Sequence, residues 1–176
     1  NSQIKIFKDK VLLVDSKNSI HCYSVKDGKK IWKFNTDKPL IKSQKKLSLV
    51  VKDNKVIFNN SIGDITAINI SDGKLIWQTP TQSSKIYREA MFLNSSDLVL
   101  KDNSIYYSNN KNEFFSIDTE TGILNWIQKI NSSLRPVSIN NLIFTITNEG
   151  YFVVLNNNGE IIRSTYLLKN IKEKKR

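Results

Sequence analysis

Residues 67–77 read AINISDGKLIW, an alternating apolar run followed by a glycine turn and by a tryptophan four residues after the glycine. Similar units recur at 22–32, at 115–126 and at 155–163, where an arginine takes the place of the tryptophan. The four turn glycines, which are separated by 45, 49 and 37 residues, are Gly28, Gly73, Gly122 and Gly159. This period is within or near the range of β-propeller blades. The chain is therefore predicted to be built by radial duplication of one unit.

Short strands account for nearly the whole chain. Within the second unit, four apolar or alternating runs are separated by the turn sequences KDN, SIGD and SDG, which is the pattern of consecutive strands. The other units divide in the same way, so we expect sixteen strands in four antiparallel sheets. The dipeptides that end at the four turn glycines supply the positive φ that tight hairpins need. No stretch of twelve residues has the apolar spacing of an amphipathic helix with caps.

We expect one partial propeller domain over residues 1–176, of the all-β class. Four-stranded sheets cannot bury both faces alone, so they are expected to stack around an axis. The expected limits of the four blades and of a basic tail are 3–37, 46–80, 95–131, 134–168 and 169–176.

Composition limits the possible functions without selecting one. The chain has 176 residues, of which 39% are hydrophobic, and no apolar run long enough to span a membrane as a helix. Its net charge of +11 is spread over all four units, apart from the run at 169–176. A lysine-biased, soluble protein explains this better than a dedicated anion or nucleic-acid site, so we expect no nucleic-acid partner. Because the chain begins with Asn1 rather than methionine, we expect a processed or trimmed piece.

The units CYSVKDGKKIW, AINISDGKLIW and FSIDTETGILNW resemble the A-x-D-x-x-T-G-x-x-x-W repeat of the quinoprotein-like, or PQQ-repeat, β-propellers. That family includes the pyrroloquinoline-quinone alcohol dehydrogenases and the non-catalytic BamB lipoproteins of the outer-membrane β-barrel assembly machinery. Ala67 keeps the leading alanine of the repeat, whereas Cys22 and Phe115 replace it. The resemblance covers roughly the full chain at one motif per blade.

The resemblance implies that Trp32, Trp77 and Trp126 dock against the adjoining blade, together with the turn glycines. Arg163 in the fourth unit then indicates a weaker or solvent-facing joint. Rings in this family usually have seven or eight blades, so we expect the four units to be part of a larger ring. Self-association is expected if the ring is incomplete.

No catalytic, cofactor-binding or metal-binding residue is assigned. His21 is the only histidine and Cys22 the only cysteine, and neighbouring residues of a strand point to opposite faces. A dehydrogenase of the family would imply adjacent cysteines beside the cofactor, and a single cysteine cannot supply them. The acids Asp27, Asp72 and Glu120 lie at the repeated hairpin, where bonding to the turn backbone accounts for them.

The segment from Thr81 to Ser96 holds the extra length of the third unit. Links between blades lie on the same side of a propeller as the turns between second and third strands. Tyr87 and Arg88 are therefore candidate partner contacts, since both residue types are favoured at interfaces. Met91 and Phe92 are more simply explained as inner-strand residues.

The leading functional hypothesis is a non-catalytic scaffold similar to BamB, which presents blade loops to a protein of the β-barrel assembly machinery. This implies a periplasmic location, with membrane contact only through a lipid anchor upstream. Two alternatives stay open: a fragment of a PQQ-dependent quinoprotein oxidoreductase and an anion-binding surface protein.

Overall fold

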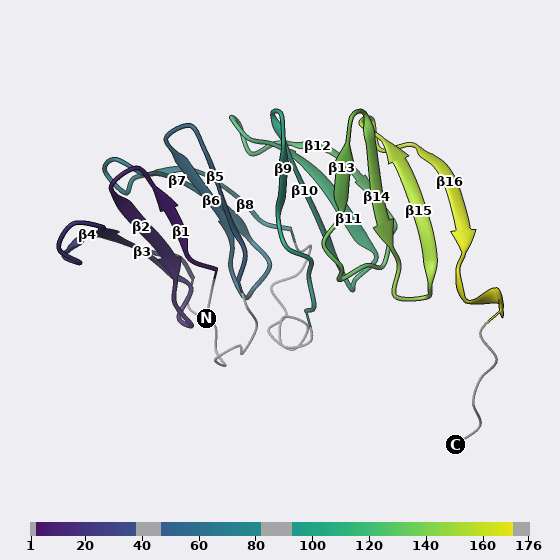
Figure 1. The fold of residues 1–176 in the computed structure, drawn as a ribbon, viewed down its shortest axis with the longest axis horizontal. Coiled ribbons are helices and arrows are strands. Elements are labelled where there is room, and N and C mark those ends of the chain that lie inside the picture. Colours follow the sequence, from purple (N-terminus) through teal and green to yellow (C-terminus); the bar gives the residue numbers. More distant parts are fainter. Residues whose placement is uncertain (1–2, 38–46, 82–92, 171–176) are drawn as a thin grey trace, which may run out of the picture. The chain divides into compact units, whose positions relative to one another are not determined.

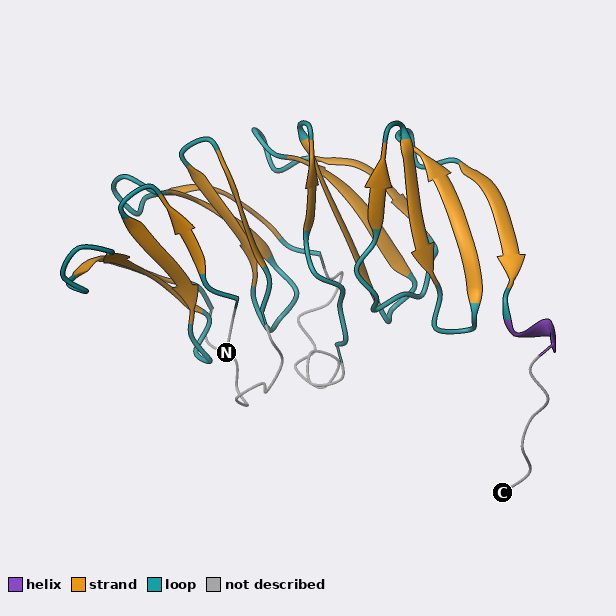
Figure 2. Cartoon of the chain, viewed as in Figure 1, coloured by secondary structure: helices purple, strands orange, loops and turns teal. Residues whose placement is uncertain are grey.

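The computed structural model of the chain describes residues 3–37, 47–81 and 93–170. These residues form sixteen strands and one short 3-10 helix (Figures 1 and 2). The all-β prediction is therefore confirmed, with a strand for each of the runs expected from the sequence.

The strands form four sheets of four. The first sheet contains β1 (Lys5–Phe7), β2 (Lys10–Val14), β3 (Ser19–Ser24) and β4 (Lys30–Asn35). The second contains β5 (Leu49–Lys52), β6 (Lys55–Asn59), β7 (Ile65–Asn69) and β8 (Leu75–Thr79). The third contains β9 (Val99–Lys101), β10 (Ser104–Asn109), β11 (Glu113–Asp118) and β12 (Leu124–Gln128). The fourth contains β13 (Val137–Ile139), β14 (Leu142–Ile146), β15 (Tyr151–Asn156) and β16 (Ile161–Tyr166).

Each sheet is an antiparallel meander in which strands consecutive in the chain are neighbours. The third and fourth strands of every sheet show a register shift at the same place. The residues that pair just before this bulge are Cys22 with Trp32, Ala67 with Trp77, Ser116 with Trp126 and Val154 with Arg163. Arg163 therefore occupies the same position in its sheet as the three tryptophans do in theirs.

The hairpin before each fourth strand depends on its glycine. Gly28, Gly73, Gly122 and Gly159 have φ angles of 68°, 72°, 74° and 84°, a region that side chains with a Cβ rarely enter. In the first two hairpins an aspartate supports the turn, because Asp27 and Asp72 accept hydrogen bonds from backbone N–H groups two residues later, at 3.3 and 3.1 Å. The expected turn chemistry is confirmed at these two positions.

The chain divides into two compact units. The first comprises residues 1–93 together with 120–123, and the second comprises 94–119 together with 124–176. The interpretation of residues 1–176 as a single propeller domain, with the blade limits given above, stays a prediction.

The core of the first unit lies between the first and second sheets. One face of the first sheet supplies Leu12, Val14, Ile20 and Cys22, with Trp32 and Phe34 packed at the edge. The second sheet and the residues that flank it supply Leu47, Leu49, Val56, Phe58, Ile68 and Ile70. Full burial of each large aliphatic side chain contributes about 1.5–3 kcal/mol. This cluster therefore holds the two sheets together.

The second unit has an equivalent core that is richer in aromatic rings. Tyr106 and Phe114 of the third sheet pack with Ile143, Val153 and Leu155 of the fourth. The Trp126 indole lies edge-on to Phe114, with ring centroids 5.6 Å apart. In both units, then, one face of a sheet covers the opposite face of the next.

Helical structure is minor. Among the described residues the only helix is η1 (Leu168–Asn170), which follows β16 (Figure 2). Within the same ranges, no helix has the length and hydropathy needed to cross a membrane.

Candidate partner-binding face

The most regular feature of the molecule is a tryptophan that covers a glycine of the following repeat. Trp32 leaves β4 and lies against Gly73, where a Cβ would be 2.7 Å from Cδ2 of the indole. Its Nε1–H donates a hydrogen bond of 2.9 Å to the carbonyl oxygen of Ile70. The glycine thus provides both the turn and the flat seat for the ring.

Two further copies of this contact are present. Trp77 covers Gly122 and Trp126 covers Gly159, with Cβ positions 2.6 Å from the nearest ring carbon in each case. Trp126 Nε1–H donates to the carbonyl of Asn157 at 2.7 Å. Gly122 lies in the turn 120–123, which groups with the first unit.

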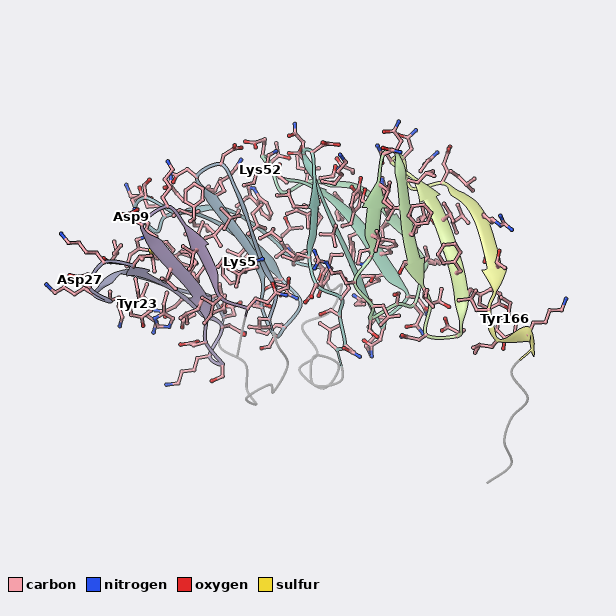
Figure 3. The ribbon with its side chains drawn as sticks, viewed as in Figure 1. Lys5, Asp9, Tyr23, Asp27, Lys52 and Tyr166 are labelled. Carbon is pink, nitrogen blue, oxygen red and sulfur yellow. The ribbon has the colours of Figure 1, made fainter. Side chains whose placement is uncertain are left out.

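In that same turn, Glu120 forms ion pairs with Lys55 and, at 3.7 Å, with Lys52, which Figure 3 labels. The hairpin backbone is supported there by Thr121, whose hydroxyl accepts a hydrogen bond from the Ile123 N–H at 3.3 Å. The position of Glu120 in the repeat predicted bonding to the turn backbone. It did not predict these ion pairs with lysines of the second sheet.

The turns between second and third strands are built on asparagine. In the first sheet Asn18 is fully buried and has a positive φ of 62°. Its side chain donates to the carbonyl of Asp37 at 3.0 Å and accepts from the N–H of Ser61 at 3.0 Å. Thr36 donates its hydroxyl hydrogen to the Asn18 carbonyl at 2.8 Å. One side chain thus joins the β2–β3 turn, the segment after β4 and the β6–β7 turn.

The β6–β7 turn is also fixed by a buried asparagine. Asn60 Oδ1 accepts hydrogen bonds from the N–H groups of Ile62, Gly63 and Asp64 at 3.0, 2.9 and 2.9 Å. Thr81, which follows β8, donates its hydroxyl hydrogen to the Gly63 carbonyl. The first residues after β4 and β8 are therefore each hydrogen-bonded to a turn that is built on a buried asparagine.

The second unit uses the same chemistry at its own turns. Asn109 is fully buried and donates to Glu113 at 2.7 Å. Asn148 donates to Asn131 at 2.7 Å, and Asn131 in turn donates to the Glu149 carboxylate. The pKa of Glu149 is lowered, first by the hydrogen bond from Thr147 and then by its backbone and Asn131 partners.

These asparagines were not identified as site residues from the sequence. The signal is present, since every segment between a second and a third strand contains asparagine: DSKNS at 15–19, NNSIGD at 59–64, NNKNE at 109–113 and TNEGY at 147–151. It is weak because asparagine is common throughout the chain, and only the structure shows which copies are buried and bonded.

Comparison with known proteins identifies the family of the chain. A family model described as "Outer membrane protein assembly factor BamB" matches residues 3–165. The chain belongs to this PQQ-repeat family. No curated protein matches the chain significantly in sequence.

Solved structures show that the fold of this BamB-family chain is a β-propeller. BamB from Moraxella catarrhalis superposes with a TM-score of 0.75 at 18% identity, covering 95% of this chain and 52% of that one. The computationally designed Ika8 protein gives 0.65 at 14% identity, with coverage of 92% and 48%. A europium-containing methanol dehydrogenase gives 0.69 at 13% identity, with coverage of 94% and 41%. The chain spans about half the length of the first two proteins and less of the third.

His21 and Cys22 lie on opposite faces of β3, as alternation predicted. Cys22 is fully buried in the core of the first unit, and burial raises the pKa of its thiol. His21 Nε2 is 2.9 Å from Asp15 Oδ2, and its ring stacks on Tyr23 at 6.0 Å. Burial raises the pKa of Asp15, but the hydrogen bonds from His21, Ser19 and Lys17 outweigh this and lower it overall.

Three predictions about site residues remain: the partner contacts, the absence of metal ligands and the docking residues. Tyr87, Arg88, Met91 and Phe92 lie outside the described residues. Within the described ranges, no three His, Cys, Asp or Glu side chains are grouped closely enough to hold a metal ion. The docking role of the tryptophans and glycines stays a prediction.

Proposed function

We propose that this BamB-family chain is a non-catalytic propeller scaffold that binds another protein during assembly of outer-membrane β-barrel proteins. The observation that carries the proposal is the family match, which extends over residues 3–165 and bears the name of an outer-membrane assembly factor. The M. catarrhalis BamB neighbour supports the same architecture. On this proposal the protein acts in the periplasm, and any membrane contact is made through a lipid anchor upstream.

The surface that we propose for the partner is the side of the sheets that carries the asparagine-built turns. A scaffold needs loops held on a rigid support, because ordering them at the moment of binding reduces affinity. Asn18 and Asn60 provide such support in the first unit, since each is fully buried and bonded to several backbone groups. Tyr87 and Arg88, in the segment after β8, are the proposed anchors.

The proposal is tested by site-specific photo-crosslinking in cells. A photoreactive amino acid is introduced at Tyr87 in one variant and at Ile162 in another, as a control on the outer strand β16, where the side chain is exposed. We expect position 87 to cross-link to a component of the β-barrel assembly machinery and position 162 not to do so. Absence of such a product at position 87, with the protein present in the periplasm, contradicts the proposed surface.

A second measurement separates this function from the oxidoreductase alternative. That alternative is considered because a methanol dehydrogenase has a similar fold. Cys22 is the only cysteine, so the adjacent-cysteine ring implied for the dehydrogenases cannot form from this chain. Purified protein is mixed with pyrroloquinoline quinone and calcium and then separated from free quinone. We expect no bound chromophore, whereas stoichiometric retention together with alcohol-dependent dye reduction would replace the scaffold proposal.

A further inference from the structure

Asn158 is the only asparagine of the chain that is followed by a glycine. It lies in the turn between β15 and β16 (Figure 1), where Asn157 and Asn158 are exposed and Gly159 is buried. The equivalent positions of the other three hairpins carry no side-chain amide: they are Asp27, Asp72 and Thr121. The fourth hairpin is therefore the only one in which a side-chain amide directly precedes the turn glycine.

An asparagine that precedes a glycine loses its amide without an enzyme when the backbone is free to turn. The glycine nitrogen gives up its proton and attacks Cγ of the asparagine, while the side-chain nitrogen takes up a proton and leaves as ammonia. Water then opens the resulting succinimide ring. Cleavage of the bond from nitrogen to Cγ gives aspartate, and cleavage of the bond to the main-chain carbonyl carbon gives isoaspartate, in which the chain runs through Cγ. Glycine favours the attack because it has no side chain to obstruct it.

Hydrogen bonds fix both of the peptide groups that flank Asn158. The carbonyl of Asn157 accepts from the Trp126 Nε1–H at 2.7 Å. The N–H of Asn158 donates to Asn156 Oδ1 at 3.0 Å, and the N–H of Gly159 donates to the Asn156 carbonyl, also at 3.0 Å. Attack on Cγ requires the peptide group of Gly159 to turn toward the Asn158 side chain, which breaks this last bond. The closed hairpin therefore opposes the reaction.

The indole of Trp126 adds a second constraint. It covers Gly159 so closely that a Cβ built there would lie 2.6 Å from Cδ2 of the ring, so the glycine cannot move toward the indole. The ring itself packs edge-on against Phe114, with centroids 5.6 Å apart. The turn is closed further by the Glu160 N–H, which donates to Asn156 Oδ1 at 2.9 Å. Opening of this hairpin therefore requires the docked ring and several turn hydrogen bonds to separate together.

We propose that Asn158 and Gly159 form a site of spontaneous deamidation whose rate is controlled by the docking of Trp126. The reaction takes place in the open form of the hairpin, so its rate follows the population of that form. Loss of the indole from Gly159 also removes the hydrogen bond to the Asn157 carbonyl, and the Asn158 backbone is then free to turn. The contact that stabilises the sheet packing thus also protects the amide of Asn158.

Deamidation has a lasting effect on the docking contact. An isoaspartate at position 158 puts an additional carbon atom into the main chain between the Asn157 carbonyl and Gly159, which are the two groups that Trp126 contacts. The spacing of these two groups then no longer fits one indole. An aspartate keeps the normal main chain and adds only a charge, so it leaves the seat of the ring in place.

Prolonged incubation of the full chain at neutral pH tests the proposal. Peptide mapping by mass spectrometry gives the deamidated fraction of residue 158 as a function of time. We expect the rate in the folded chain to be about tenfold or more below the rate in chain unfolded with guanidinium chloride. Trp126→Ala should raise the rate in the folded chain about tenfold or more. Equal rates in folded and unfolded chain, absence of product in both, or an unchanged rate in the variant overturns the proposal.

Trp77→Ala is the matched control. Trp77 covers Gly122 just as Trp126 covers Gly159, so its removal causes the same kind of loss at a different hairpin. The rate at Asn158 should stay within about twofold of that in the native chain, and an equal acceleration by both variants contradicts control by the docked ring. Circular dichroism establishes that each variant is folded. Should Trp126→Ala not fold, Trp126→Phe keeps a ring but loses the donor to Asn157, and an unchanged rate in it overturns the proposal.

The effect of the modification on docking is measured on the product. The isoaspartate form is separated from the unmodified chain by ion-exchange and reversed-phase chromatography, and Asn158→Asp serves as the control for the added charge. We expect the isoaspartate form to unfold at a lower urea concentration than Asn158→Asp, because only the former changes the main chain beneath the indole. Equal unfolding midpoints would contradict the loss of the seat.

Discussion

The Trp32 indole lies on Gly73 so closely that a single added methyl carbon would be 2.7 Å from its Cδ2 atom. The same indole donates a hydrogen bond to Ile70, so the ring is fixed both by contact and by direction. Two separate properties favour glycine at this position: the positive φ of its backbone and the space that it leaves for the ring.

Comparison of Gly73→Ala with Gly28→Ala separates the two reasons. Both glycines have nearly the same φ, but only Gly73 is covered. Gly28→Ala should lower the free energy of unfolding by about 1–2 kcal/mol through backbone strain alone. Gly73→Ala should cost about 1–3 kcal/mol more, because the ring must move. Urea unfolding measures both losses, and equal losses would show that the indole does not constrain the turn.

Truncation of the docked ring tests its contribution to stability. Trp32→Ala should lower the free energy of unfolding by about 3 kcal/mol, since it removes a half-buried aromatic from the sheet contact. Trp32→Phe keeps a ring but loses the donor to Ile70 and should cost about 1 kcal/mol.

Arg163→Ala provides the matched control for Trp32→Ala, because Arg163 holds the same position in its sheet but is exposed. The free energy of unfolding should change by less than about 0.5 kcal/mol. A loss comparable to that of Trp32→Ala would show that the position is stabilising whether or not it is covered.

Asp15 should make stability depend on pH on the acid side. Its pKa in the folded chain lies below the usual 3.8, despite burial, because His21 and two backbone N–H groups stabilise the carboxylate. The unfolded chain therefore binds the proton more readily, so the contribution is complete above 3.8 and is lost as the pH falls through the folded value. The difference in stability between the native chain and Asp15→Asn should shrink over this range.

A carbon-detected NMR titration of the Asp15 carboxyl gives the direct measurement. A midpoint below 3.8 in the folded chain is expected. A midpoint at or above that value would mean that desolvation outweighs the hydrogen bonds.

The rate of alkylation of the Cys22 thiol should measure unfolding of the first unit. It is fully buried, and burial raises the pKa of its thiol, so both access and thiolate content are low. Alkylation should be negligible in the native chain and should follow unfolding as urea is added. In a Cys22→Ser background, Lys29→Cys gives an exposed thiol for comparison. Rapid native labelling of Cys22 would contradict its burial.

Much of the architecture could be predicted from the sequence, because its causes are local. Alternation over residues such as 64–70 gives strands, and Asp72-Gly73 gives a hairpin whatever surrounds it. The equal spacing from Gly28 to Trp32 and from Gly159 to Arg163 also shows in the sequence that the fourth unit has an arginine where the first has a tryptophan.

The turns at Asn18 and Asn60 could not be identified in this way. An asparagine in a loop is ordinarily solvated, and its burial depends on segments such as 36–37 and residue 61 arriving beside it. Glu120 is a similar case, since its lysine partners are more than sixty residues earlier in the chain.

By itself, then, the sequence determined the repeat, the strands, the hairpins and the family, since each depends on residue spacing within one unit. Only the tertiary structure decided which glycines are covered and which asparagines are buried. Those properties depend on contacts between residues that are distant in the chain. The spacing of residues within one unit does not determine which of these contacts form.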